Sequence, residues 1–402
     1  MPLTPRQRLF RNAFSQLRVF PVLGWGGHEL WQRFLSVPGT STALAPHDCD
    51  LFLLAGEIPS QWRERIRAMV DTVARPRTVV WLRPSWHCEA PKGIRIHHSV
   101  ASSRVESLRL SSLALELQAN SGKAVPRQGH EAIQHVPGSA GSAVVLGPHF
   151  PGLPSGLQLE LRLDGDRIRA CEGVHNAFPL TPFSTTDPVK LGAGNLPALK
   201  VLLGRGSTMS AMESARWYNH ISWMADFIAL AGMPGAAAQL RPLRRLPDRD
   251  AFRRIVARVE PKLKPLCPGI GTVSASTVRR LGLSGPVARA SGVAADARNE
   301  DAAYLSLGFE PVLETDGDAW ARWRVHVREC EQSLNLIARG RNCPINAAEG
   351  PRGTFRQGDS VFVAPTTSLF PLLETRLRGL EWSQALLFIG SLDLSPLEAA
   401  LQ

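Results

Sequence analysis

A strand, a helix and a second strand follow one another early in the chain, and this order restricts the fold more than any other feature. Residues 50–56 are a short apolar run, residues 59–73 mix charged and apolar residues at helical spacing, and residues 77–82 are a second apolar run. Short continuous apolar runs predict strands that are buried on both faces. Two such strands joined by a helix pair in parallel, so an α/β domain with a parallel sheet is predicted.

The residues before this unit are predicted to alternate between helix and loop. Residues 7–18 would form an amphipathic helix, whose apolar face consists of Leu9, Phe10, Phe14 and Leu17. A glycine-rich turn, Gly24-x-Gly26-Gly27, then opens another helix. A dinucleotide-binding fingerprint needs a strand directly before such a turn. No strand is predicted there, so the turn lacks part of that fingerprint.

Composition divides the chain into two domains. Residues 118–142 are dominated by Gly, Ser, Pro, Gln and His and have no apolar periodicity, which is typical of a linker. The α/β domain is therefore predicted to cover residues 1–117, and a second domain residues 143–402.

The second domain is predicted to be a mainly helical α+β domain that opens with a β-hairpin. Residues 157–163 alternate strictly between apolar and polar, and the Asp164-Gly165 pair that follows favours a tight hairpin turn. The best helices by length and periodicity are Ala211–Leu230 and Trp320–Ala338.

The charge balance restricts the partners. The formal net charge is +11 and arginine supplies most of it, which fits an anionic membrane surface or acidic partner subunits. No lysine/arginine tract or basic motif interleaved with aromatic residues stands out, so nucleic acid is not expected as a partner. The longest uncharged stretch, residues 137–159, is broken by glycines and prolines and does not predict a membrane span. With no signal-peptide core near Met1, the protein is expected to be cytoplasmic.

Several short motifs of the second domain occur in an order that resembles one family. In order, they are Gly147-Pro148-His149-Phe150-Pro151, Tyr218-Asn219-His220, Gly285 to Val293, Asp301 to Tyr304, Gly317 to Arg322, Glu349 to Gly353 and Gly390 to Asp393. Together they resemble the large subunit of nickel–iron hydrogenases and of respiratory complex I, the NADH-quinone oxidoreductase. The first domain, with Gly27-His28-Glu29-Leu30 before its strand–helix–strand unit, resembles the small subunit of the same complexes. An unrelated α/β domain is the alternative for that part.

The chain departs from this family at the metal ligands. The resemblance implies two Cys-x-x-Cys pairs that bind nickel and iron through soft thiolates. No cysteine lies between His175 and Glu213, where the first pair would be, and the second would fall near Ser395 and Glu398. The small subunit's cysteine pair would fall on Trp25 and His28, and a four-iron cluster needs about four thiolates. Nickel, iron and iron–sulfur cluster are therefore predicted to be absent.

A quinone is the cofactor that the resemblance leaves open. The complex I large subunit uses its pocket for quinone, and its opening motif carries a histidine where this chain has Phe150, with His149 one place earlier. His149 could serve as a quinone donor or be a structural histidine beside two prolines.

The family's loops also suggest internal ion pairs. Asp226 lies within an apolar helix and would need a partner if buried, for which Arg289, Arg322 and Arg352 are candidates. Glu349 with Arg352, and Asp393 with Arg289, are further predicted pairs, which could relay protons or be structural. No catalytic residue is predicted. The candidate pocket residues are His149, His220, Asp226, Arg289, Glu349, Arg352 and Asp393.

Three functions follow as hypotheses. The first is a metal-free docking and coupling subunit of a membrane-attached, energy-converting complex, peripheral to the inner face of the cell membrane through multi-spanning partner subunits. The second is a quinone- or NAD-linked oxidoreductase subunit, against which the lost thiolates stand. The third is a free-standing soluble binding module.

Overall fold

The computed structural model describes residues 17–108, 142–177, 201, 206–346, 349, 355–357, 360–362 and 369–394, apart from residues 38, 74–77 and 85–86. The chain forms two compact units. The first comprises Met1–Ser142 and His149–Ser155, and the second Ala143–Pro148 and Gly156–Gln402. All of the predicted linker except Ser142 lies outside the described residues.

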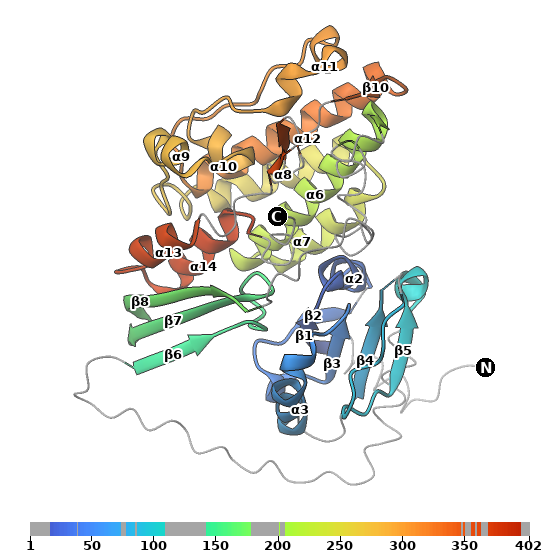
Figure 1. Cartoon of the computed structure of the whole chain (residues 1–402), viewed down its shortest axis with the longest axis vertical. Helices are drawn as coiled ribbons and strands as arrows, with labels where there is room; N and C mark the ends of the chain where they lie inside the picture. Colours follow the sequence, from blue (N-terminus) through green and yellow to red (C-terminus); the bar gives the residue numbers. More distant parts are fainter. Residues whose placement is uncertain are drawn as a thin grey trace. The chain divides into compact units, whose positions relative to one another are not determined.

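The first unit contains a five-stranded parallel sheet (Figure 1). Its strands, in the spatial order β2-β1-β3-β4-β5, are Thr40–Thr42, Leu17–Leu23, Leu51–Ala55, Thr78–Arg83 and His98–Ala101. This is a doubly wound order, in which the first strand lies inside the sheet. The predicted parallel sheet is confirmed.

One helix covers each face of this sheet. Helix α2 (Gly27–Phe34) buries Leu30, Trp31 and Phe34 against one set of strand side chains. Helix α3 (Arg63–Thr72) buries Ile66 and Val70 against the other set. Because both faces are covered, β3 is buried at all five positions, as its continuous apolar run predicts.

The start of the chain differs from the prediction. Residues 7–16 lie outside the described residues, but Leu17 and Arg18, predicted at the end of a helix, lie in strand β1. For these two residues the prediction was wrong, because the apolar spacing that ends at Leu17 suggests a helix, whereas pairing with β2 and β3 fixes this segment as a strand. A strand therefore does lead directly into the turn at 24–27.

The glycines of that turn are required by close backbone contact. The Gly24 nitrogen donates to the Ala55 carbonyl at 2.8 Å, and the Trp25 nitrogen donates to the Glu57 carbonyl at 3.0 Å. A Cβ on Gly24 would lie 2.0 Å from the Glu57 oxygen, and one on Gly27 would lie 2.2 Å from the Ala55 oxygen. The backbone at the end of β3 and just after it thus fills the space over the turn.

The second unit opens with a three-stranded sheet of β6 (Ser142–Leu146), β7 (Leu157–Asp164) and β8 (Arg167–Asn176). Strands β7 and β8 pair antiparallel around Asp164-Gly165, with Gly165 at a φ of 62°. The hairpin is anchored to the loop that follows α13 (Phe370–Arg376), because the Ile168 nitrogen donates to the Leu380 carbonyl at 2.9 Å.

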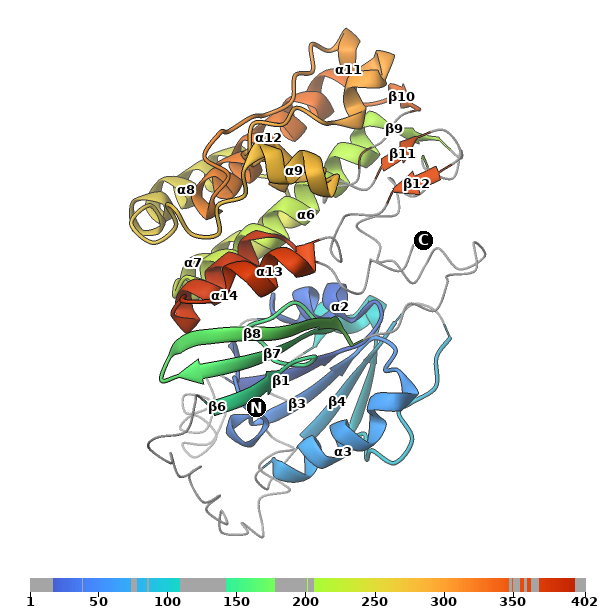
Figure 2. The ribbon, with the colours of Figure 1, turned by 60° about the vertical axis from the view of Figure 1, so that its left-hand side comes forward.

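Two 22-residue helices, α6 (Met209–Leu230) and α12 (Ala319–Gly340), form the centre of the helical part (Figure 2). Thr208 caps the start of α6 and Asp318 that of α12, each accepting from a backbone nitrogen. The predicted helical C-terminal part is confirmed. Around the pair lie α7 (Pro234–Leu240), α8 (Arg249–Leu263), α9 (Ala275–Leu281), α10 (Gly285–Ala290), α11 (Ala302–Ser306) and α14 (Trp382–Ser391).

The remaining elements are short. Strands β9 (Ser207–Thr208) and β10 (Pro344–Ile345) pair antiparallel, as do β11 (Phe355–Gln357) and β12 (Ser360–Phe362). The apolar core between the helices includes Trp217, Phe227, Phe252 and Trp323. Among the described helices, none combines the length and apolarity that a bilayer span requires.

Candidate functional site

A polar stripe on each of the two long helices builds a buried charge cluster. Helix α6 contributes Glu213, Arg216 and His220, and α12 contributes His326, Glu329 and Ser333. Both sets have the spacing i, i+3, i+7, which places the three side chains of each helix on one face. All six residues are at most 1% exposed, although they lie in mainly apolar surroundings.

Glu329 is the centre of the cluster. Its carboxylate accepts from Arg216 Nη2 at 2.6 Å and from Arg289 Nε at 2.6 Å, and His220 Nε2 lies 3.0 Å away. Burial alone would raise the pKa of Glu329, but Arg289 and Arg216 outweigh burial and hold this pKa well below its usual range. Glu329 is therefore ionised.

Arg289, on α10, joins two further carboxylates to the centre. Its Nη1 donates to Glu349 Oε1 at 2.6 Å and to Asp296 Oδ2 at 3.0 Å. Burial raises the pKa of Glu349, although Arg289 opposes the shift, whereas the pKa of Glu329 is lowered. Two carboxylates on one arginine thus have pKa values that are pushed apart, as in sites that exchange a proton.

Asp296, Arg298 and Glu213 form a further part of the cluster. Arg298 donates two hydrogen bonds to Asp296, from Nε at 2.9 Å and from Nη2 at 2.7 Å. Glu213 accepts from the hydroxyls of Tyr304 and Ser333, each at 2.6 Å. Burial, followed by the charge of Glu213, raises the pKa of Tyr304 well above its usual range, so its proton stays on the phenol.

The last part of the cluster is a pair of histidines, His220 and His326. Nδ1 of His220 lies 2.8 Å from Nδ1 of His326, and the His326 ring stacks on Trp223 with ring centres 3.7 Å apart. A single proton lies between two such nitrogens. Burial lowers the pKa of His220, and hydrogen bonding to Glu329 only partly offsets this, so the ring is neutral at pH 7.

The cluster carries a small excess of acid. Full ionisation would give three positive and four negative charges, on Arg216, Arg289 and Arg298 and on Glu213, Asp296, Glu329 and Glu349. One additional proton would neutralise this set. The arrangement can therefore hold a proton at Glu349, whose pKa burial raises, while the other groups remain ion-paired.

Of the predicted pocket residues, the structure brings three together: His220, Arg289 and Glu349. Sequence reasoning missed Arg216 and Glu329, which contact these three residues, and Glu213, which contacts Arg216. The i, i+3, i+7 spacing of polar residues in each helix could have indicated them. Glu349 pairs with Arg289, whereas its predicted partner Arg352 lies outside the described residues.

For Asp226 the predicted pairings with Arg289 and Arg322 are wrong, and so is the pairing of Asp393 with Arg289. The third candidate for Asp226, Arg352, lies outside the described residues. The side chain of Asp226 is about one-third exposed and lies 3.5 Å from Arg241, because that side of α6 faces the segment after α7. Asp393 follows α14 in the left-handed region, with a φ of 50°, while Arg289 is committed to Asp296, Glu329 and Glu349.

Arg322 is also buried, but apart from the cluster. It donates to the Ser391 hydroxyl at 2.8 Å and to the carbonyls of Gly317 and Gly271 at 2.8 and 3.0 Å. Burial lowers the pKa of Arg322 to about 10, opposed by Asp318. This residue ties the start of α12 to the end of α14.

His149 belongs to the first unit. Its ring packs edge-on against Trp62, with centres 5.8 Å apart, and it is 7% exposed. Burial, with the charge of Arg65 nearby, lowers the pKa of His149 to about 4. The ring is therefore neutral at pH 7 and packed as a core residue.

No two cysteines of the chain form the Cys-x-x-Cys pairs through which the hydrogenase family binds its metals. In the second unit, burial raises the pKa of Cys267 to about 12 and that of Cys330 well above its usual range. In the first unit, burial raises the pKa of Cys49 to about 12 and that of Cys88 to about 11. Within the described ranges, no group of three or more acidic, histidine or cysteine side chains could hold a metal ion.

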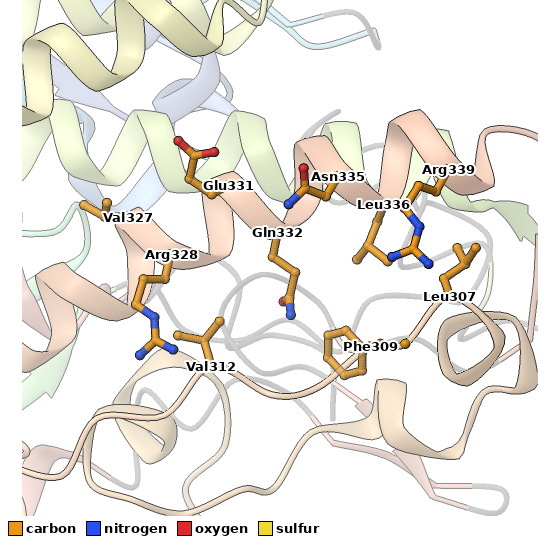
Figure 3. Close-up of a pocket in the computed structure, with 11 residues that line it drawn as sticks. Leu307, Phe309, Val312, Val327, Arg328, Glu331, Gln332, Asn335, Leu336 and Arg339 are labelled. Carbon is orange, nitrogen blue, oxygen red and sulfur yellow. The ribbon is translucent and has the colours of Figure 1, made fainter.

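A separate pocket of about 400 Å³ lies on another side of α12 (Figure 3). Leu307, Phe309, Val312 and Leu336 form its apolar part, and Arg328, Gln332 and Arg339 are among its polar residues. None of the candidate pocket residues lines it. The charge cluster and this pocket are therefore distinct features.

The fold is shared with a respiratory membrane complex. The chain is similar to one chain of the membrane-bound sulfane sulfur reductase, described as an archaeal respiratory membrane complex, with a TM-score of 0.50. The two are 17% identical, and the match covers 65% of this chain and 98% of the other. At this level of sequence identity, the similarity shows a shared fold alone.

The sequence match is more specific. Residues 251–367 match the family described as the respiratory-chain NADH dehydrogenase 49 Kd subunit. One subunit of the NADH-quinone oxidoreductase of Rhizobium etli is 41% identical over 85 residues, which are 21% of this chain and 20% of the relative. The predicted resemblance to the large subunit of complex I is therefore confirmed.

Other relatives extend the same match. One subunit of the NAD(P)H-quinone oxidoreductase of Trichodesmium erythraeum is 32% identical over 148 residues, 33% of this chain and 37% of the relative. One subunit of the F(420)H(2) dehydrogenase of Methanosarcina mazei is 34% identical over 109 residues, 26% of this chain and 29% of the relative. The chain thus matches 20–37% of the length of these relatives.

Proposed function

We propose that the chain is a subunit of a membrane-attached, complex-I-like assembly, in which it acts as a metal-free docking and coupling element. The observation that carries the proposal is the position of the charge cluster within the matched segment. Arg289, Asp296, Arg298, Tyr304, His326, Glu329, Ser333 and Glu349 all fall inside residues 251–367.

The cluster suggests how coupling could operate. A buried network with one exchangeable proton and opposed carboxylate pKa values responds to a charge change near it by moving that proton. Because α6, α10 and α12 each supply a member, a proton shift alters the contacts between three helices. This coupling requires no thiolate and no metal.

The proposal also includes the domain organisation of the chain and its location in the cell. In it, residues 1–117 correspond to a degenerate small-subunit-like domain without iron–sulfur ligands, residues 118–142 to a linker, and residues 143–402 to a large-subunit-like domain opened by its hairpin. The partners would be multi-spanning membrane subunits of an antiporter-like kind, at the inner face of the cell membrane. What supports assembly with partners is that the relatives are named as subunits of an NADH-quinone oxidoreductase and an F(420)H(2) dehydrogenase, and that the solved relative belongs to a membrane-bound respiratory complex.

The test is affinity purification of the full chain from its native cell in mild detergent, with metal analysis on the same sample. Co-purifying multi-spanning subunits without stoichiometric nickel or iron would support the proposal. A quinone or another redox centre bound to the complex would favour the alternative, an oxidoreductase subunit of the parent class. Recovery of the chain alone would contradict assembly and favour a free-standing binding module.

A further inference from the structure

Helix α8 has one buried face and one strongly basic face. Phe252, Ile255, Val256, Val259 and Leu263 are buried, and most of them pack in the core between the helices. On the opposite face Arg254, Arg258 and Lys262 are exposed. Their spacing of four residues places these three cations in one row along the helix, which lies along the edge of the helical part (Figure 2).

The charges of this face are little neutralised. Among the described residues, no ion-pair partner lies beside Arg254, Lys262 or the neighbouring Lys264. Two acids lie at the start of α8: Asp248 accepts from the Ala251 nitrogen as the cap, and the exposed Asp250 lies one turn before Arg254 in the same row. Arg258 donates to the neutral Gln239 Oε1 at 2.9 Å, so the row carries three positive charges and one negative charge. The row therefore presents net positive charge to its surroundings.

Exposed leucines flank the row at both ends. Leu246, just before α8, is 76% exposed, and Leu266, just after it, is 43% exposed. Large apolar side chains at both ends of a basic helix face are what an interfacial helix offers to lipid, since the cations reach phosphates and the apolar groups enter the boundary below them.

We propose that the exposed face of α8 binds directly to an anionic lipid bilayer, with Arg254, Arg258 and Lys262 contacting headgroup phosphates. Leu246 and Leu266 enter the interface on either side. The proposal rests on the proposed function in that the chain works at a membrane. It goes beyond that function because the contact is made by this chain itself, and not through partner subunits.

The test compares vesicle binding by the purified full chain. Vesicles of phosphatidylcholine alone are compared with vesicles that also contain phosphatidylglycerol, in a flotation assay at low and high salt. We expect binding only to the anionic vesicles, weakened by salt. The variant Arg254→Glu/Lys262→Glu should lose at least roughly 25-fold in partitioning, at about fivefold for each cation removed.

A matched control has the same change in net charge elsewhere. Arg279→Glu/Arg280→Glu alters two exposed arginines on α9. It should retain most of the binding, and Leu246→Ser/Leu266→Ser should weaken it at high salt. Equal losses in the two charge variants would overturn the assignment to α8, because net charge alone would then explain binding. Unchanged thermal unfolding of each variant shows that the fold is intact.

The outcome is separable from that of the proposed function. If the wild-type chain ignores anionic vesicles but co-purifies with membrane subunits, the lipid contact is overturned and the proposed function stands. If the wild-type chain ignores anionic vesicles and binds an acidic partner subunit through the basic row, the row is assigned to that partner and the lipid contact is overturned. Vesicle binding by a chain that purifies alone would support the lipid contact and contradict the assembly.

Discussion

Nδ1 of His220 lies 2.8 Å from Nδ1 of His326, and the two rings join helix α6 to helix α12. Only one of these nitrogens can carry a proton in the neutral pair. Because His220 Nε2 lies 3.0 Å from the ionised Glu329, the proton of His220 is expected on Nε2. His326 would then donate from Nδ1 to His220.

The histidine pair gives the first prediction. Nitrogen NMR of histidine-labelled protein at pH 7 should show His220 with its proton on Nε2 and His326 with its proton on Nδ1. His326→Gln should move the His220 signals, because its hydrogen-bond donor is lost, while His149 in the first unit should be unaffected. An imidazolium signature on His220 at pH 7 would contradict the neutral pair.

The second prediction concerns the centre of the cluster. Glu329→Gln removes the charge that neutralises Arg216 and Arg289, so the free energy of unfolding should fall by about 3–5 kcal/mol. The matched control is Glu331→Gln, two residues further along α12, whose partner Arg253 is exposed. That change should cost below about 1 kcal/mol in denaturant titration. Similar costs for both variants would show that the buried arginines do not depend on Glu329.

The third prediction concerns the hydroxyls on Glu213. Tyr304→Phe and Ser333→Ala each remove a 2.6 Å hydrogen bond to this buried carboxylate. Each should lower the free energy of unfolding by about 1–3 kcal/mol. The double variant should deviate from the sum by at least about 0.5 kcal/mol, since both donors serve one acceptor. Strict additivity in a double-mutant cycle would argue against a shared network.

The fourth prediction is that the protein loses stability in acid, partly because His149 is held neutral in the folded state. The pKa of His149 is about 4 in the folded chain and near 6.5 when unfolded, so the unfolded state takes up the proton first. The free energy of unfolding is therefore unaffected by protonation of His149 above pH about 6.5. As the pH falls towards 4 it declines, by up to about 3 kcal/mol. His149→Phe keeps a ring against Trp62 and should flatten this decline in urea titrations. An unchanged pH profile would contradict the depressed pKa.

The fifth prediction is that three buried thiols are inert. Cys49, Cys267 and Cys330 are at most 5% exposed, and burial raises the pKa of each. At pH 8 the native chain should leave them unlabelled by iodoacetamide, while urea-unfolded protein should be labelled at all six cysteines. Rapid native labelling of Cys267 or Cys330 would mean that thiolates are available and would reopen the question of a metal.

The sequence predicts the elements better than the contacts between them. Helices α6 and α12 and the strands β3 and β4 follow from apolar periodicity, which depends on local residues alone. Strand β1 was missed because its identity comes from pairing on both sides with β2 and β3, which no local pattern reveals.

The site was predicted in part. The resemblance led to His220, Arg289 and Glu349, but not to Glu329, on which the first two converge. The predicted pairings of Asp226 with Arg289 or Arg322, and of Asp393 with Arg289, are wrong because partner choice depends on which face of a helix turns inward. The polar residues at i, i+3, i+7 in both long helices would have indicated the missing members.

The central claim is that this chain is a subunit of a membrane assembly, and one measurement tests it directly. Native membranes are solubilised in mild detergent, separated by size, and probed for the chain alongside a mass-spectrometric inventory of each fraction. The account predicts that the chain elutes in a large complex together with multi-spanning subunits. Elution of the chain at its monomer mass of 43.8 kDa, with no membrane protein following its profile, would contradict the account.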